Sequence, residues 1–302
     1  MSYTPGWIPE LELTDKVIGS DTTLSRFISL SMGRKIVFVG MMIILVMIVL
    51  TIFAPWIAPH DPYKQDLSLS LQPPSSEYLL GTDKFGRDSL SRLIFGTRIA
   101  MFVGIVAVSI AASIGILLGL ISGYYGRWID QVTMRITDAL MSLPTVVMAL
   151  ALAYLFGGGI SNVMLAVGIA FSPLFIRVTR SQVLLLRETD YVTAARVIGA
   201  SNLRIMFFHI LPNTIPILIV LCTLQIGTAI ILEASLSFLG VGIKPPGAAW
   251  GYDLRLAYEV IFRYPILSVV PGICITAAVL SFNLVGDAVR DALDPRLKGV
   301  LR

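Results

Sequence analysis

The residues best placed for specific chemistry lie in a polar stretch between two apolar regions, residues 191–213. This stretch combines Arg196 and Arg204 with the small residues Ala194 and Ala195. Small side chains let the backbone of a second chain come close to a helix, and arginines supply charge beside that contact. Such a short helix can be held in a groove on another protein. The chemistry indicated is therefore recognition of a protein partner.

The first half of this stretch is predicted to be a short helix. Residues 188–190 (Glu-Thr-Asp) supply N-cap and first-turn groups, and good helix formers follow over residues 192–198. Gly199 then occupies the position where many helices end in a left-handed residue. The simplest alternative is that Gly199 is only a helix C-cap and the alanines are only good helix formers, and the stretch alone does not exclude it.

The second half is predicted to be another helix after a bend. Ser201 can cap this helix, which would run from Asn202 to about Leu211. Pro212 would end it, because proline lacks the N–H group that a continuing helix needs. The expected local structure is a helix, a bend and a helix.

The spacing within this stretch resembles a family pattern. The cytoplasmic coupling loop of bacterial ATP-binding cassette (ABC) importer permeases usually reads Glu-Ala-Ala, three residues, Gly, nine residues, Ile-x-Leu-Pro. The matching positions here are Ala194, Ala195, Gly199, Leu211 and Pro212. Thr193 replaces the usual Glu and His209 the usual Ile, so the spacing is intact but no salt bridge is expected from Thr193. The resemblance implies a contact with a partner ATPase through Thr193, Ala194, Ala195, Arg196, Gly199, Ala200, Leu211 and Pro212.

Three further strings agree with this family. The string GTDKFGRDSLSR, residues 81–92, resembles the second permease subunit of dipeptide and oligopeptide (peptide/nickel) importers. Residues 233–251 (EASLSFLGVGIKPPGAAWG) and 282–298 (FNLVGDAVRDALDPRLK) are similar to it as well. The similarity therefore extends from about Leu80 to Lys298. The last string is expected to form a short cytoplasmic helix with alternating Asp and Arg, either solvated or in a second partner contact.

The charged residues in the first of these strings are interpreted as an ion-pair elbow at the membrane surface. A metal site at Asp83 and Asp88 is poorly supported, because no ligand-rich loop surrounds them. Asp88 can instead cap an amphipathic helix that leads into the following apolar run.

Several enzyme and carrier signatures are absent from the sequence. It contains no GxxxxGK[ST] phosphate loop, so the chain is not expected to hydrolyse ATP. It contains no HExxH or GxSxG string, and its two histidines, His60 and His209, are far apart. An ion-coupled carrier would need acidic or histidine side chains deep in the membrane, and the long apolar runs carry none.

Composition indicates an integral membrane protein. Of the 302 residues, 56% are hydrophobic and only 14% are charged, with a mean hydropathy of +0.82, whereas soluble domains have about 25% charged residues. Runs without Asp, Glu, Lys or Arg cover residues 36–60, 99–126, 139–176, 205–232 and 264–286. A spanning helix needs about 20 apolar residues. The third run is too long for one span and is broken by glycines 157–159, so it is predicted to be a helical hairpin, which makes six spans.

Charge asymmetry predicts the orientation of these spans. With both termini in the cytoplasm, 15 of the 23 Lys and Arg residues fall on cytoplasmic segments and 8 on external ones, as the positive-inside tendency requires. The net charge of +4 then reflects topology, and no nucleic-acid partner is expected. The first 35 residues are polar and show no cleavable signal pattern, so the first span is expected to be an uncleaved anchor.

Several residues within the spans have a structural interpretation. If the hairpin begins near Ile129, Arg135 and Asp138 lie inside its first helix, and their spacing permits a mutual ion pair. Cys222 and Cys274 are interpreted as small core residues, with no disulfide or metal indicated. Other small or polar residues are assigned to a smooth packing stripe (Ala111, Gly115, Gly119, Gly123), to helix bends (Pro144, Pro271), and to the pathway lining or bonds between helices (Gln225, Asn283).

The sequence thus predicts an all-α membrane protein with the six-helix fold of a type I ABC importer permease. Its expected parts are a cytoplasmic segment (1–35), a first span (36–57), an external loop with an amphipathic elbow (58–98), a five-helix core (99–286) with the coupling loop at 186–213, and a cytoplasmic tail (287–302). The resemblance implies a homologous second permease, two ATPases that bind ATP and Mg, and an external solute-binding protein as partners, with peptides as cargo. The chain itself is expected to hold no cofactor. Nickel complexes, glutathione or sugars are alternative cargoes, and a self-sufficient carrier or a scaffold is a distant alternative.

Overall fold

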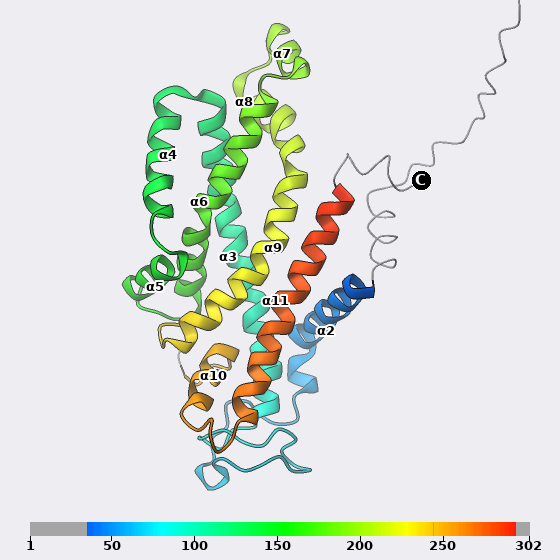
Figure 1. Ribbon diagram of the computed structural model, residues 1–302, viewed down its shortest axis with the longest axis vertical. Helices are drawn as coiled ribbons and strands as arrows, with labels where there is room; N and C mark the ends of the chain where they lie inside the picture. Colours follow the sequence, from blue (N-terminus) through cyan, green and yellow to red (C-terminus); the bar gives the residue numbers. More distant parts are fainter. Residues whose placement is uncertain (1–34, 244, 294–302) are drawn as a thin grey trace, which may run out of the picture.

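The computed structural model describes residues 35–243 and 245–293, and the regular secondary structure in this part is helical apart from one isolated β-bridge, between Thr82 and Asp88. Five helices in it are long and apolar enough to cross a membrane: α2 (Lys35–Ile57), α3 (Ser89–Tyr125), α6 (Ile160–Leu186), the continuous helix Asn202–Phe238 that contains α9 (Leu211–Phe238), and α11 (Ile266–Leu293). Figure 1 shows them side by side as one bundle, with α2 at its edge. The predicted N-terminal segment, residues 1–35, lies outside the described residues except for Lys35. The predicted tail, residues 287–302, is described only to residue 293, and that part continues α11 instead of forming a separate short helix.

The predicted hairpin takes a more bent form than expected. Its first arm consists of α4 (Arg127–Met141) and α5 (Thr145–Leu155), which meet at 94°. Pro144 is the residue directly before α5, where its fixed φ suits a helix start, so the predicted bend is present as a complete break. Glycines 157–159 all have positive φ and separate α5 from α6, as predicted. The number of spans is six if α4 and α5 together make one.

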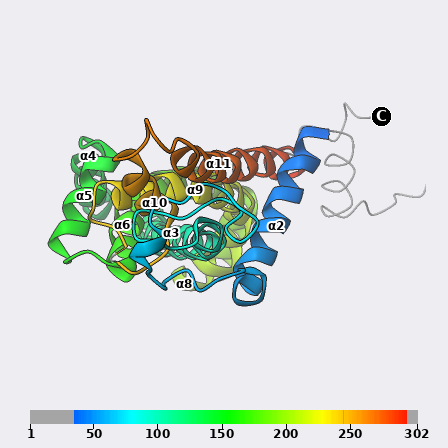
Figure 2. The ribbon, with the colours of Figure 1, turned by 90° about the horizontal axis from the view of Figure 1, so that it is seen from below.

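The connecting segments gather at the two ends of the bundle. One end, the loop end, carries the short helices α7 (Asp190–Val197) and α8 (Asn202–Arg204). The opposite end, the elbow end, carries residues 58–88, with the 3-10 turn η1 (Leu67–Leu69), and α10 (Trp250–Tyr258), as Figures 1 and 2 show. Segments that the charge asymmetry assigned to opposite faces of the membrane therefore lie at opposite ends.

Helices α3 and α6 pack directly against each other along the predicted stripe of small residues. A Cβ atom placed on Gly115 would stand 2.1 Å from Cβ of Phe175, and one on Gly119 would stand 2.7 Å from the carbonyl oxygen of Ile176. Neither distance is compatible with a side chain, so only glycine allows this approach. The stripe is confirmed as an internal helix–helix contact.

We expect Gly119→Val to destabilise the folded protein. Its new methyl groups would clash with the backbone of α6, which cannot move aside as a flexible side chain could. Overpacking a close-packed core costs about 1–3 kcal/mol, and a backbone clash falls at the upper end of that range. The midpoint of thermal unfolding in detergent should fall clearly. Gly272→Val is the matched control, because Gly272 is also helical but has open space around its Cβ position. Equal midpoints for the two variants would contradict the packing argument.

Candidate partner-docking loop and its supports

The first half of the predicted coupling loop (residues 186–213), called the docking loop below, has the predicted helical shape. Helix α7 begins after Thr189 and ends at Val197. Gly199 has φ +85°, its N–H donates to the Arg196 carbonyl at 3.1 Å, and the Ala200 N–H donates to the Ala195 carbonyl at 3.0 Å. This is the paired bonding of a Schellman C-cap. The helix therefore stops because Gly199 adopts a left-handed conformation that other residues adopt only at a cost.

The second half differs from the prediction beyond its first residues. Ser201 does cap α8 as expected, with its hydroxyl accepting from the Arg204 N–H at 3.4 Å. The helix does not end at Pro212 but continues through a π turn, Ile205–Ile210, into α9. In the π turn the Leu211 N–H donates to the Met206 carbonyl, five residues back. Pro212 thus stands in the first turn of the next α-helical segment, where a missing N–H costs little, so the predicted stop was wrong.

Of the two alanines in the motif, Ala195 is buried and Ala194 is exposed. Ala195 is buried with Val192, Ile205 and Met206 in a small apolar core that also includes Leu120, Val183 and Ile210. Ala194 is exposed. The expectation that a partner backbone approaches both alanines is therefore wrong for Ala195, because this side chain holds α7 against the π turn.

The outer surface of the loop is more apolar than the sequence motif suggested. Val197, Ile198, Leu203 and Phe208, called the loop tip below, expose 81%, 84%, 62% and 76% of their surface. Arg196 and Arg204 lie exposed beside them. Large apolar side chains that are exposed at the loop end of the bundle indicate a surface that a partner covers. The signal was present in the sequence, as apolar residues on both sides of the Gly199 bend, but the family motif does not contain them.

The remaining predicted contact residues are spread along the same segment. Thr193 is exposed on α7, and Gly199 is exposed, with no atom within 4 Å of the position that a Cβ would occupy. Ala200 and Leu211 are half-buried, and Pro212 is exposed on the spanning helix. The first part of the motif, from Thr193 to Ala200, thus lies at the end of the bundle, whereas Leu211 and Pro212 are the first two residues of α9.

Hydrogen bonds fix the loop to the helices that precede it. The Tyr124 hydroxyl at the end of α3 donates to the Asn202 side chain at 2.9 Å. The Arg187 guanidinium donates to the Gly123 carbonyl at 2.9 Å. These bonds connect the loop to α3 and α6, which are themselves closely packed.

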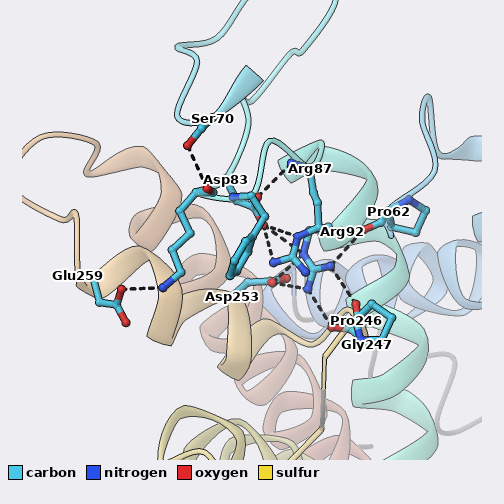
Figure 3. Close-up of polar contacts among 11 residues, drawn as sticks. Pro62, Ser70, Asp83, Arg87, Arg92, Pro246, Gly247, Asp253 and Glu259 are labelled. Carbon is cyan, nitrogen blue, oxygen red and sulfur yellow. Dashed lines mark hydrogen bonds and ion pairs between the residues drawn. The ribbon is translucent and has the colours of Figure 1, made fainter. Parts of the chain in front are cut away.

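The elbow end is held by the predicted ion pairs, and their centre is Arg92, shown in Figure 3. Arg92 is 1% exposed and donates to Asp253 Oδ1 from two nitrogens, at 2.8 and 2.6 Å. It also donates to the carbonyls of Pro62, Pro246 and Gly247, at 3.0, 3.3 and 2.9 Å. One side chain thus joins the segment after α2, the start of α3, the loop after α9 and α10.

Neighbouring charges complete this elbow network. Arg87 pairs with Asp83 at 2.6 Å, and Lys84 pairs with Glu259 at 2.6 Å. Asp88 caps α3 by accepting from the Ser91 N–H at 2.9 Å, as predicted. Burial raises the pKa of Asp253 to about 6, and the charge of Arg92 opposes that rise. Asp253 is therefore still mainly ionised at neutral pH and can serve as the counter-ion of Arg92.

The predicted ion pair between Arg135 and Asp138 does not form. Asp138 pairs instead with Arg177 on α6, at 2.7 Å. A second α4–α6 pair joins Asp130 to Arg180, with Ser122 of α3 donating to Asp130 at 2.8 Å. The spacing within α4 placed Arg135 within reach of Asp138. Helix α6 lies beside α4, however, and its arginines pair with the α4 carboxylates instead. The residue pattern of one helix does not show which helix will pack beside it.

A hollow of about 420 Å³ lies between α4, α5, α6 and α9. Its polar lining includes Gln225, Thr228 and Ser235 on α9 and Thr145 on α5. Gln225 therefore lines this hollow, whereas Asn283 is half-buried on α11 and is not part of the lining; that either residue lines a translocation pathway stays a prediction.

Two further findings concern acidic and cysteine side chains. Glu233, directly after a charge-free run, is 2% exposed on α9 and accepts from the Ser237 hydroxyl at 2.6 Å, a burial that the sequence pattern did not predict.

Cys222 and Cys274 are free and half-buried. Within the described part of the chain, no three His, Cys, Asp or Glu side chains are grouped as metal ligands would be.

Two family models match the sequence. Residues 115–299 match the model described as "Binding-protein-dependent transport system inner membrane component". Residues 32–74 match the "N-terminal TM domain of oligopeptide transport permease C". The two matches cover most of the chain, and the first includes the whole docking loop.

Curated relatives and a solved structure agree with these family matches. The chain is 42% identical to the dipeptide transport system permease protein DppC of Alkalihalophilus pseudofirmus, over 88% of this chain and 87% of the relative. It is 42% identical to the di/tripeptide transport system permease protein DppC of Pseudomonas aeruginosa (86% and 88%) and 43% identical to the glutathione transport system permease protein GsiD of Escherichia coli O1:K1 / APEC (85% and 85%). A chain of the inward-facing MetNI methionine ABC transporter superposes with a TM-score of 0.56 at 16% identity, over 67% of this chain and 96% of that one, which shows a shared fold.

Proposed function

Because the chain belongs to the family of inner-membrane components of binding-protein-dependent transport systems, we propose that it is one of two permease subunits of an ABC importer for short peptides. It is a multi-pass protein of the cytoplasmic (inner) membrane with the type I importer permease fold. The peptide cargo is inferred from relatives of about 40% identity that are named as dipeptide permeases. A relative named for glutathione makes that peptide the second candidate.

The observation that carries this proposal is the exposed loop tip beyond the end of the bundle. Val197, Ile198 and Leu203 would be costly to leave in water, because burying a side chain of this size contributes about 1.5–3 kcal/mol. A partner with an apolar groove and an acidic rim fits both this surface and the adjacent Arg196 and Arg204. We assign that partner as a cytoplasmic ATPase, which would bind the ATP and Mg.

The complete transporter would contain this chain, a homologous permease, two ATPase subunits and an external solute-binding protein. The excess of Lys and Arg on predicted inner segments supports a cytoplasmic loop end and an external elbow end. Closure of the ATPases would move the loop tip, and Tyr124 and Arg187 would pass this movement to α3 and α6. The two permeases would then alternate between inward and outward openings.

Co-purification and uptake test this proposal together. The tagged chain, extracted from its native membrane in mild detergent, should retain ATPase chains and a second permease, identified by mass spectrometry. The reconstituted complex with its binding protein should take up labelled dialanine only when ATP is supplied on the loop side. Recovery of this chain alone, under conditions that preserve other transporters, would favour a scaffold. Transport by the chain alone without ATP would favour a self-sufficient carrier.

A further inference from the structure

The ion pair Asp138–Arg177 is unusually exposed for its position. The side chains retain 58% and 49% of their accessible surface, although they lie on α4 and α6 within the helical bundle. The neighbouring pair Asp130–Arg180 joins the same two helices but is far less exposed, at 19% and 27%. The two pairs therefore differ in what surrounds them, even though both connect α4 to α6.

Asp138 lies away from the loop end of the bundle, one turn before the break that separates α4 from α5. It follows Asp130 by eight residues of continuous helix, which corresponds to about 12 Å along the axis. Arg177 precedes the end of α6 at Leu186 by nine residues, or about 13 Å. Exposed charges are costly against lipid tails, so we expect this face to border water or another protein.

The hollow between α4, α5, α6 and α9 begins next to this pair. Its lining includes Leu140 and Met141, just beyond Asp138, and Pro173 and Leu174, one turn before Arg177. The hollow presents several hydroxyl and amide groups from α5 and α9 along its length. A mostly apolar hollow that carries a few hydroxyl and amide groups and ends beside an exposed ion pair has the mixed lining that is typical of ligand sites.

The pair also retains free bonding capacity. A single contact joins the two side chains, Arg177 Nη2 to Asp138 Oδ1, and their remaining oxygen and nitrogen atoms have no partner among the described residues. Arg135, one turn from Asp138, is exposed and forms no hydrogen bond or ion pair with any residue that the structure describes. The three side chains offer one site for an ammonium group and two for a carboxylate.

Resting on the proposed import of peptides, we propose that Asp138, Arg177 and Arg135 form a transit site for charged groups of the peptide in the translocation route. A peptide carries an ammonium group at one end and a carboxylate at the other, and a lysine or aspartate side chain adds a further ammonium or carboxylate group. These groups exchange with the existing Asp138–Arg177 contact, the ammonium onto Asp138 and the carboxylate onto the arginines. Because the exchange replaces one exposed ion pair by two similar ones, the peptide is held weakly and released readily.

The test uses the complete transporter in proteoliposomes with its own binding protein at saturation. The measured quantity is the ratio of maximal uptake rates for an acidic dipeptide, Ala-Asp, and a basic one, Ala-Lys. Arg177→Gln should lower this ratio about threefold and Asp138→Asn should raise it about threefold, as expected for one exposed charge interaction. The binding protein is unchanged, so its own preference cancels between variants.

The opposite signs separate recognition from a structural role. Both variants break the same ion pair, so a mere tether between α4 and α6 would affect acidic and basic peptides equally in each. Arg180→Gln is the matched control, because it breaks the less exposed pair between the same helices and should leave the ratio unchanged whatever its effect on total uptake. A ratio that stays constant, or that moves in the same direction in both variants, overturns the inference, as does failure of both variants to assemble.

The outcome also separates this inference from the proposed function. If the wild-type complex imports neither dipeptide, the proposed peptide cargo is wrong. If it imports both and the two variants keep the wild-type ratio, peptide import stands and only the transit site is rejected.

Discussion

Replacement of Gly199 by aspartate is expected to reduce peptide uptake to the background of cells without the transporter, while the protein still inserts and accumulates normally. Gly199 has no atom within 4 Å of its Cβ position, so a side chain there causes no clash within the chain. Its φ of +85° is tolerated better by Asp and Asn than by other side chains. The change therefore leaves the loop folded but places a charge and extra volume beside the loop tip, where the ATPase is proposed to dock.

Two measurements separate lost docking from lost folding. Membrane content by immunoblot should match wild type, whereas co-purification of the ATPase and ATP-driven uptake of dialanine should both fail. Gly199→Asn is the control of equal shape: loss of uptake in both variants would indicate that volume blocks a close approach, and loss in Asp alone would indicate repulsion by charge. Full uptake by the Asp variant would contradict docking at this surface.

The second large effect is expected at the opposite end of the molecule. Arg92→Met should destabilise the fold, because it leaves Asp253 buried without its cation and removes the donors of three backbone carbonyls. Breaking a buried pair by removing one partner costs about 3–5 kcal/mol. The thermal midpoint in detergent and the amount of protein in the membrane should both decrease strongly.

Matched variants identify the cause of this loss. Arg92→Lys should recover only part of the stability, because an ammonium group cannot replace the planar set of donors that bonds several acceptors at once. Lys84→Met removes a more exposed pair at the same end, with side-chain exposures of 26% and 56%, and should change the midpoint little. If Arg92→Met were as mild as Lys84→Met, the elbow network would not hold this end together.

The sequence predicts most of what local chemistry determines. Long charge-free runs required spanning helices, the left-handed Gly199 followed from its position after a run of helix formers, and Asp88 was correctly assigned as the cap of α3. The small residues of α3 predicted a close helix contact. In each case the cause lies within one segment, where composition and spacing determine the result.

The differences all involve contacts between segments. Asp138 forms its ion pair with Arg177 and not with Arg135, because the partner depends on which helix lies alongside α4. Ala195 faces inward because the π turn folds back against α7, and the sequence pattern does not show which face will be covered. The hydrogen bond from Arg92 to Asp253 joins residues 161 positions apart and could not be predicted from the string that contains Arg92. The contact between the docking loop and an ATPase stays a prediction.

The π turn that precedes Pro212 also determines how the loop tip is aimed. Each residue of an α-helix turns the chain by about 100°, and a π turn accommodates one residue more than an α-helical turn. If that one residue were deleted, the downstream helix would stay anchored in the bundle, and everything before it would rotate by roughly a quarter of a revolution about its axis. Val197 and Ile198 would then point in a new direction without any change in their own identity or local structure. The direction of the loop tip relative to the bundle is thus determined by the number of residues in the π turn, so a change of one residue would rotate it by about 100°.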